Sequence, residues 1–375
     1  MKFKVLSTEL TSHLAAASRV LVSKNSLPIL DNFLFEVQGE TLTVTASDGD
    51  TTMVTSVQIS EVEGSGVFVV PAKTIIEPIK DLPQQELSLE IDGGNYEIMV
   101  TYSNGTYHFI GGDGSDYPTQ RPLEAGSQSF EINAQGLLNG VQSSLFATAN
   151  DEMRPVMNGI YFDIHTDRVI FVASDSKKLV RLANTTTAPG FEGSFILPKK
   201  PANLLKSIIS KDMLLCTITF DSKAARFQLG SYTLSCRLID GRYPRYEAVI
   251  PKFNTKVLTI DRQLFLSSLR RIAVFSNSAT NQVRFDIEPS RLVISAQDVD
   301  YSTSGNEEIA CTFTDDAMSI GFRANFLMEI LSTITSQEVE MMLSDPGRAA
   351  LVLPVQNNEG EDLLMLIMPM MLTDF

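Results

Sequence analysis

V-I-F-V-A-S-D-S-K-K-L-V-R-L-A, from Val169 to Ala183, is an apolar run that ends at Asp175, turns polar, and then becomes apolar again. The same pattern ends at Asp48, in L-T-V-T-A-S-D, and at Asp298, in L-V-I-S-A-Q-D. Each version predicts a strand that ends in a polar turn. The chain therefore contains three versions of one pattern, one in each third of its length.

The spacing of independent landmarks identifies this pattern as an internal repeat. A distance of 127 residues separates Asp48 from Asp175 and also Phe35 from Phe162, and 123 residues separate Asp175 from Asp298. A period this long indicates tandem domains rather than a solenoid of short repeats. The expected domains are residues 1–126, 127–252 and 253–375.

The composition is that of a globular protein. The chain has 375 residues, 43% of them hydrophobic, and three units of about 125 residues are each long enough to bury a core. No run approaches the roughly 18 apolar residues of a membrane span, and the N-terminus, M-K-F-K-V-L-S-T-E-L, lacks the apolar centre of a signal peptide. We expect a cytoplasmic protein that does not enter a membrane.

The cysteines and histidines do not predict a metal site. Three cysteines without a C-x-x-C pair are typical of buried thiols in a reducing compartment, and the three histidines are scattered. We therefore expect no metal and no cofactor. The cysteines are Cys216, Cys236 and Cys311, and the histidines are His13, His108 and His165.

Each third predicts two helices packed on antiparallel strands, which is an α+β architecture. The first helix of each third follows a short strand, with Thr8 and Asp261 as expected N-caps in the first and third copies. A hairpin precedes each second helix. The expected first helices span residues 8–24, 133–147 and 261–275, the hairpins 32–48, 159–175 and 283–298, and the second helices 71–82, 198–211 and 322–334.

The charge of the chain is divided between the helices and the rest. The net charge is −15, but the six expected helices sum to +7 and the remaining residues to −22. In the helix from Pro198, Lys199 and Lys206 lie opposite the apolar stripe that contains Leu205. A cationic helical surface favours nonspecific contact with a polyanion backbone. The alternative is that lysines decorate any exposed helix face.

The whole chain resembles the bacterial β sliding clamps, the processivity subunits of DNA polymerase III. The repeat and four stretches carry this resemblance: residues 158–179; L-S-C-R-L-I-D-G-R-Y-P-R-Y-E-A-V-I-P at 234–251; V-E-M-M-L-S-D at 339–345; and M-P-M-M-L at 368–372. The resemblance implies a head-to-tail homodimer whose six domains close into a ring, with helices around duplex DNA and sheets outside. It also implies loading by an ATP-driven clamp loader and no catalysis.

The resemblance further implies that the replicative polymerase and other clamp-binding proteins dock through short linear peptides between the second and third domains. Leu179 and Met370 would form apolar walls, and Lys177 and Lys178 an exposed rim. The family usually has T-D-G-x-R-L where this chain has S-D-S-K-K-L, and M-P-M-R-L where it has M-P-M-M-L. The implied pocket comprises Met157, Ser174, Lys177, Lys178, Leu179, Pro244, Val249, Met368, Pro369, Met370 and Leu372.

Two further sets of residues follow from the resemblance and from the charge on the helices. The expected DNA-facing residues are Lys24, Lys199, Lys200, Lys206, Arg270 and Arg271. The expected dimer seam pairs a first-domain strand with the third domain of the other chain, where Phe109 and Phe275 would be exposed in a monomer. The seam residues are Tyr107, Phe109, Val274 and Phe275.

Two other classes of function remain as alternatives. A hydrolase would need a nucleophile elbow, clustered histidines or a metal motif, and the sequence contains none of these. The glycine-rich segment Gly111–Gly114 is not followed by the Lys-Ser/Thr of a phosphate-binding loop. A scaffold that never meets DNA is the second alternative, and retention on circular but not linear duplex would distinguish it from a clamp.

Overall fold

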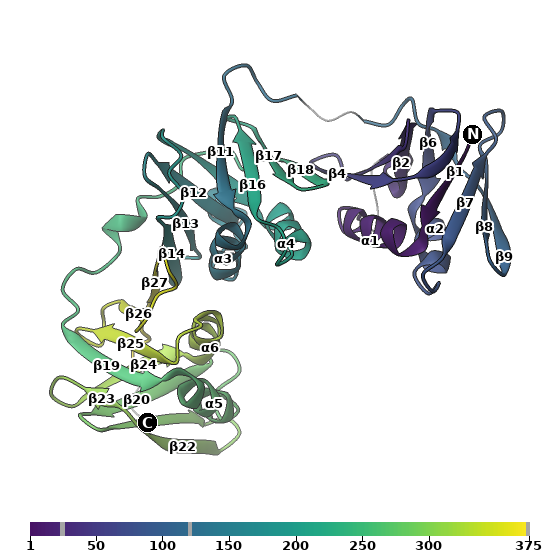
Figure 1. The fold of residues 1–375 in the computed structure, drawn as a ribbon. Helices are drawn as coiled ribbons and strands as arrows, with labels where there is room; N and C mark the ends of the chain where they lie inside the picture. Colours follow the sequence, from purple (N-terminus) through teal and green to yellow (C-terminus); the bar gives the residue numbers. More distant parts are fainter. Residues whose placement is uncertain (23–26, 119–121, 373–375) are drawn as a thin grey trace. The chain divides into compact units, whose positions relative to one another are not determined.

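The computed structural model describes residues 1–22, 27–118 and 122–372 (Figure 1). The expected DNA-facing residue Lys24 therefore lies outside the described residues. The chain divides into two compact units, one formed by residues 1–137 and 200–238 and the other by residues 138–199 and 239–375. None of the described helices is long and apolar enough to cross a membrane.

The first unit contains two antiparallel sheets. One has five strands, in the order β5 (Ser60–Glu63), β1 (Lys2–Leu6), β7 (Glu86–Ile91), β8 (Glu97–Tyr102) and β9 (Gly105–Ile110). The other has nine strands, in the order β10 (Gly112–Asp113), β6 (Gly66–Pro71), β2 (Asn32–Gln38), β3 (Thr41–Ser47), β4 (Thr51–Gln58), β18 (Tyr232–Arg237), β17 (Ala224–Leu229), β16 (Leu215–Phe220) and β11 (Gln128–Asn133).

The second unit also contains a nine-stranded sheet and a smaller one. The larger has the order β15 (Gly193–Pro198), β12 (Gly159–His165), β13 (Arg168–Ser174), β14 (Lys178–Asn184), β27 (Glu361–Ile367), β26 (Ala350–Pro354), β25 (Glu338–Leu343), β19 (Lys256–Asp261) and β23 (Thr312–Phe313). The smaller has the order β22 (Thr303–Ala310), β21 (Arg291–Asp298), β20 (Gln282–Glu288) and β24 (Met318–Arg323).

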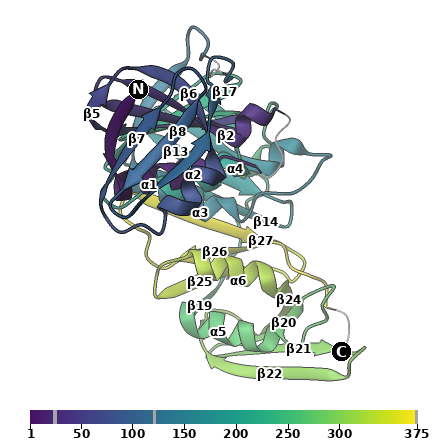
Figure 2. The same cartoon turned by 90° about the vertical axis from the view of Figure 1, so that its right-hand side faces the viewer.

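Six α-helices and three short 3₁₀ helices are present in the described part of the chain. In the second unit, α5 and α6 contact each other and strands of both sheets, so the helices form a layer across the sheets (Figures 1 and 2). The helices are α1 (Ser7–Ser18), α2 (Ala72–Ile79), α3 (Ala134–Leu145), α4 (Lys199–Ile208), α5 (Arg262–Ala273) and α6 (Ala324–Thr333). The 3₁₀ helices are η1 (Pro28–Asp31), η2 (Pro155–Asn158) and η3 (Tyr246–Ala248).

The internal repeat is confirmed by the conformation at its three aspartates. In each copy the carboxylate Oδ1 accepts the backbone N–H groups two and three residues further along the chain. The distances are 3.0 and 2.7 Å at Asp48, 2.8 and 2.9 Å at Asp175, and 3.0 and 3.4 Å at Asp298. Such an Asx turn closes a tight link between two strands. The phenylalanines at the shared spacing are fully buried in all three copies: Phe35, Phe162 and Phe285.

The observed helix ends correct several expectations. The first helix begins at Ser7 rather than after Thr8, and its N-cap residue, Leu6, makes no side-chain cap bond. The cap at Asp261 is confirmed, because its carboxylate accepts the Leu264 N–H at 2.8 Å. The helices are also shorter than expected. With the observed ends, α4 and α5 carry +3 each, α1 and α6 carry −1 each, and α2 and α3 have no net charge. The positive charge is therefore concentrated on α4 and α5.

Gly140 lets α3 lie close to the strand that begins the repeated stretch. A Cβ atom at this position would lie 2.5 Å from ring atoms of Phe171. In an exposed helix, Ala is more stable than Gly by about 1 kcal/mol. Here we expect Gly140→Ala to lower the free energy of unfolding by about 1–3 kcal/mol, because the helix must shift away from the sheet. Urea denaturation measures this difference.

Gly347→Ala is the matched control, since a Cβ there would meet no atom within 4 Å. We expect its stability to change by no more than about 0.5 kcal/mol. A Gly140→Ala protein as stable as the wild type would show that α3 does not need this close approach.

Candidate functional site

Several hydrogen bonds between its own residues shape the turn between β13 and β14. Besides the Asp175 bonds, the Ser174 hydroxyl donates to the Lys178 carbonyl at 2.9 Å and accepts from the Ser176 N–H at 3.2 Å. Ser176 has a φ of 73°, the left-handed conformation that favours glycine. The turn thus has one well-defined shape, and its strained position is the one where the resembling family usually has glycine.

The C-terminal segment after β27 is fixed to the second unit through its backbone. The Met368 N–H donates to the Lys177 carbonyl and the Met370 N–H to the Gly321 carbonyl, both at 2.8 Å. The Gln282 side chain donates to the Met371 carbonyl at 3.0 Å. Through these three bonds the tail is attached first to the turn before β14, then to β24 and finally to β20.

A group of buried side chains lies beside this turn and is called here the Leu179 cluster. Val156, Ile239 and Ile250 pack against it. The 3₁₀ helix η3 and its flanks place Pro244 and Val249 at the surface next to the cluster, with Val249 58% exposed. The cluster consists of Ile170, Val172, Leu179, Ala183, Ile196, Tyr243, Tyr246, Leu351 and Leu366.

Two tyrosines in this cluster were not identified from the sequence. Tyr243 stacks on Tyr161 with 4.7 Å between ring centroids, and the Tyr246 hydroxyl donates to Asp163 at 2.8 Å. Burial raises the pKa of both Tyr243 and Tyr246, so both stay neutral at neutral pH. The signal was present in Y-P-R-Y, where two aromatic residues flank the exposed Pro244 and Arg245.

The structure places the predicted pocket residues in the second unit, at the turn, beside the Leu179 cluster or along the tail. Leu179 belongs to the cluster, Met157 contacts the Ser176 hydroxyl through its sulfur at 3.9 Å, and Lys177 bonds the tail. Met370 and Leu372 meet at Gly321, where a Cβ would lie 2.8 Å from the Met370 carbonyl oxygen.

The expectation that Lys178 forms an exposed rim is wrong. Its side chain is only 5% exposed and makes an ion pair with Glu329 of α6. Successive side chains of a strand point to opposite faces, so Lys178 lies on the other side of β14 from Leu179. The sequence could not reveal this, because the partner carboxylate is 151 residues away.

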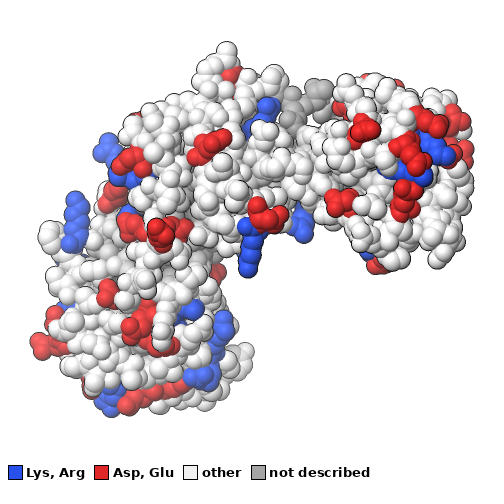
Figure 3. Space-filling view, in the orientation of Figure 1, with Lys and Arg blue, Asp and Glu red and all other residues white. Residues whose placement is uncertain are grey.

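The basic residues predicted to face DNA differ in whether their charge already has a partner within the chain. Lys200 bonds to the Asp48 carboxylate and the Val20 carbonyl, and Arg271 makes a two-point ion pair with Glu307 of β22. Lys206, Arg270 and the half-buried Lys199 complete the described set, and Lys199 also donates to Asn150. Burial lowers the pKa of Lys199; the nearby Asp175 charge opposes this effect, and the smaller influence of the Lys178 charge adds to it. Acidic and basic side chains are interspersed on the face shown in Figure 3.

The predicted seam residues lie on or beside two strands that end their sheets, β9 and β22. Tyr107 and Phe109 are half-buried on β9, and Phe275 packs over β22, where a Cβ at Gly305 would lie 2.5 Å from its ring. The expectation that Phe109 and Phe275 are exposed is therefore wrong. Val274, at 79%, is the exposed apolar residue at the end of α5.

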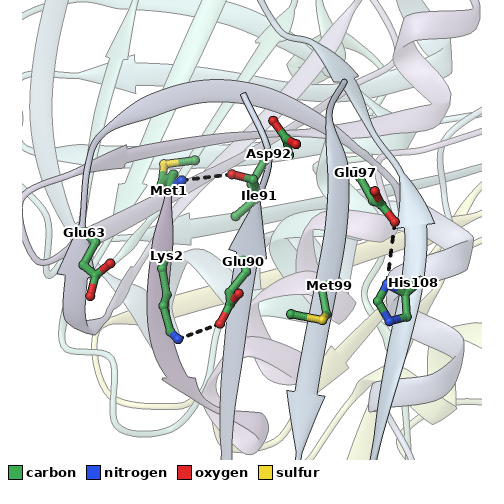
Figure 4. A pocket seen from close by; sticks show the side chains of 9 residues that line it. All are labelled: Met1, Lys2, Glu63, Glu90, Ile91, Asp92, Glu97, Met99 and His108. Atoms are coloured by element: carbon green, nitrogen blue, oxygen red, sulfur yellow. Dashed lines mark hydrogen bonds and ion pairs between the residues drawn. The ribbon is translucent and has the colours of Figure 1, made fainter. Parts of the chain in front are cut away.

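A second surface feature is a cavity of about 580 Å³ on the five-stranded sheet of the first unit (Figure 4). Lys2 pairs with Glu90 at 2.6 Å, and His108 lies 3.8 Å from Glu97. Since carboxylates outnumber cations here, this cavity does not suit a polyanion such as DNA. It is lined by Met1, Lys2, Glu63, Glu90, Ile91, Asp92, Glu97, Met99 and His108.

Within residues 1–22, 27–118 and 122–372, no group of three or more His, Cys, Asp or Glu side chains could hold a metal ion. The cysteines are free thiols. Burial raises the pKa of Cys216 and of Cys236 to about 12, which leaves both as unreactive thiols. Cys311 is half-buried rather than buried as expected.

Comparison with known proteins gives one consistent result. Family models described as the N-terminal, central and C-terminal domains of the DNA polymerase III beta subunit match residues 1–120, 131–245 and 247–371. The chain is 26% identical to the beta sliding clamp of Pseudomonas putida over 375 residues, covering 99% of this chain and 100% of that protein. It is 27% identical to the Proteus mirabilis clamp over 376 residues, with the same coverage.

A solved sliding clamp from Bartonella birtlesii, bound to griselimycin, has a TM-score of 0.91 at 27% identity. The DNA polymerase III beta subunit of Thermotoga maritima has a TM-score of 0.89 at 25% identity. In both comparisons the match covers 99% of this chain and 100% of the other.

Gly321 is the position at which β24 accepts the tail, and we expect Gly321→Ala to displace residues 370–372. The added methyl group would lie 2.8 Å from the Met370 carbonyl oxygen and 2.9 Å from Leu372 Cδ2, and close-packed structures do not accommodate contacts that short without a shift. Hydrogen exchange of the Met370 amide should become at least about tenfold faster. Gly93→Ala, with no atom within 4 Å, should leave that exchange unchanged. Unaltered protection in Gly321→Ala would mean that the tail is not held at β24.

Proposed function

From the premise that the chain belongs to the family of DNA polymerase III beta subunits, the beta sliding clamps, we propose how it assembles and where it binds its partners. Its function is that of a DNA sliding clamp, which keeps a polymerase on DNA and catalyses no reaction. The observation that carries this function is the consecutive match of all three domain models along the chain. We place the three clamp domains at residues 1–126, 127–252 and 253–375, in a protein of the cytoplasm.

The proposed assembly is a head-to-tail homodimer that closes a six-domain ring. The support is that β9 and β22 each end a sheet and so offer unpaired backbone groups along one side. Apolar side chains accompany both edges, with Ile110 71% and Val274 79% exposed. A clamp loader opens this ring and closes it around duplex DNA.

The proposed DNA contact is weak and nonspecific, because few cations remain for it. Lys206, Arg270 and Lys199 are the described candidates, of which Lys199 already donates to Asn150, while Lys200 and Arg271 have carboxylate partners within the chain. Retention on DNA then depends on the closed ring rather than on affinity. This suits a protein that must move along any sequence.

The proposed partner site is the Leu179 cluster together with the tail. Pro244 and Val249 are exposed on either side of η3, next to members of the Leu179 cluster, and exposed Met368 bonds to Lys177, two residues before Leu179. This arrangement suits an apolar anchor of a short peptide. We place the replicative polymerase and other clamp-binding proteins at this site, and we propose the same site for griselimycin, to which the Bartonella birtlesii clamp is bound.

Encirclement predicts that topology decides retention on DNA. Direct binding should be weak, and if three phosphates are neutralised, log K should fall with log salt at a slope of about −2.7. Protein loaded on a closed circular duplex should nevertheless remain at salt concentrations that abolish direct binding. Gel filtration of loaded circles, before and after one restriction cut, measures this retention. Equal loss from circular and linear DNA at high salt would contradict a ring and support the scaffold alternative.

The homodimer predicts that an acidic residue at the seam separates the subunits. We expect Val274→Asp to shift the protein to monomers, because a carboxylate buried without a partner costs several kcal/mol. Val274 is preferred to Phe275, since Phe275 also packs on β22 of its own chain. Sedimentation velocity measures the change.

Leu214→Asp is the control, because Leu214 is also an exposed apolar residue, at 75%, but lies next to β16. It should remain a dimer at the concentration where Val274→Asp is monomeric. If the Val274→Asp protein sediments like the wild type, the end of α5 is not part of the dimer seam.

A further inference from the structure

The backbone of Lys178 belongs to the turn that supports the tail. Its N–H donates to Asp175 Oδ1 at 2.9 Å, and its carbonyl accepts from the Ser174 hydroxyl at 2.9 Å. Lys178 pairs with Ile367 in the β14–β27 ladder, and the next tail residue, Met368, bonds to the Lys177 carbonyl. Any shift of Lys178 therefore moves the first anchor of the tail.

The side chain of Lys178 is fixed on the opposite face of the strand. Its ammonium pairs with Glu329 of α6 and lies 3.9 Å from Asp175 Oδ2. It also lies over two aromatic rings, 4.4 Å from the centroid of Phe326 and 5.2 Å from that of Phe146. A buried cation held by rings and a carboxylate has little freedom to move.

Helix α6 is connected to the second anchor of the tail as well. It begins at Ala324, three residues after Gly321, whose carbonyl accepts the Met370 N–H. The Glu329 carboxylate is thus placed by the same segment that holds the end of the tail. Through Lys178 this segment also holds the turn at the start of the tail.

We infer that Lys178 is a positioning residue for partner binding: its ion pair with Glu329 ties α6 to the turn and so sets the geometry of the tail beside the Leu179 cluster. This inference deepens the proposed function and rests on the partner site proposed there. Lys178 would act from the face of β14 opposite Leu179, and its side chain would not contact the bound peptide. The charge and reach of the side chain matter, and not only its volume.

The test compares variants of the full-length protein, with griselimycin as the probe in calorimetry. Glu329→Gln removes the nearer carboxylate and leaves the buried cation only the more distant Asp175, and Lys178→Met keeps the apolar stem but removes the charge. We expect each to weaken binding by about fivefold or more, and the double variant to lose no more than the larger single effect. Lys178→Arg keeps a cation that can lie over the same two rings and should bind within about twofold of wild type. If Lys178 served only to fill space, the Lys178→Met variant would bind griselimycin as tightly as the Lys178→Arg variant.

Hydrogen exchange at the Met368 amide is a second measurement. Its rate should be higher in Glu329→Gln and in Lys178→Met than in the wild type. Glu288→Gln is the matched control, since it removes a carboxylate of similar exposure, 48% against 45%, from a pair with Arg291 in the same unit. It should change neither binding nor exchange.

The outcomes separate the two proposals. Leu179→Ala removes a wall of the site itself, so if griselimycin fails to bind the wild type, or binds Leu179→Ala equally well, the partner site is wrong. If Leu179→Ala weakens binding while Glu329→Gln and Lys178→Met bind as the wild type with unchanged Met368 exchange, the site stands and the positioning role is overturned.

Discussion

Pairing of strand edges between neighbouring repeats is the constraint on which the rest of this structure depends. In the first unit, β4 of the first repeat pairs with β18 of the second over Thr51–Thr55 and Tyr232–Cys236. In the second unit, β14 pairs with β27 of the third repeat over seven positions. Each pairing converts two sheets into one of nine strands and satisfies backbone groups that a single repeat would leave exposed. The turn, the tail and the apolar cluster all lie beside the second of these pairings.

Most of the fold could be predicted from patterns of residues close together in the sequence. The hairpins at residues 32–48, 159–175 and 283–298 were predictable, because apolar residues alternate in them and turn residues separate the runs. The Asp261 cap was also predictable, since a cap depends on residues three positions apart. The missing cap at Leu6 and the early ends of the helices were not, because there the contact with the sheets overrides local preference.

The candidate site likewise contains residues that could be predicted from the sequence and residues that could not. Leu179 and the tail could be named in advance because a family motif marks them, but the directions of Lys178, Lys200 and Arg271 could not. Their carboxylate partners are 151, 152 and 36 residues away, and only the folded chain brings them together. A helix with lysines at its surface therefore has fewer free cations than its sequence suggests. For a protein that slides, a small number of loose contacts is an advantage, since tight phosphate contacts would slow movement along the duplex.

The tail is held by backbone N–H and carbonyl groups at Met368, Met370 and Met371, and its side chains make none of these bonds. Met371 is 88% and Met368 40% exposed, so residues at these positions can be exchanged while the main chain stays in place. The backbone of this segment thus fixes its shape, while the side chains of Met368 and Met371 contribute little to holding it in place. In the partner site that we propose, substitutions at Met368 and Met371 would therefore change the surface offered to a peptide while the main chain of the tail stays where it is.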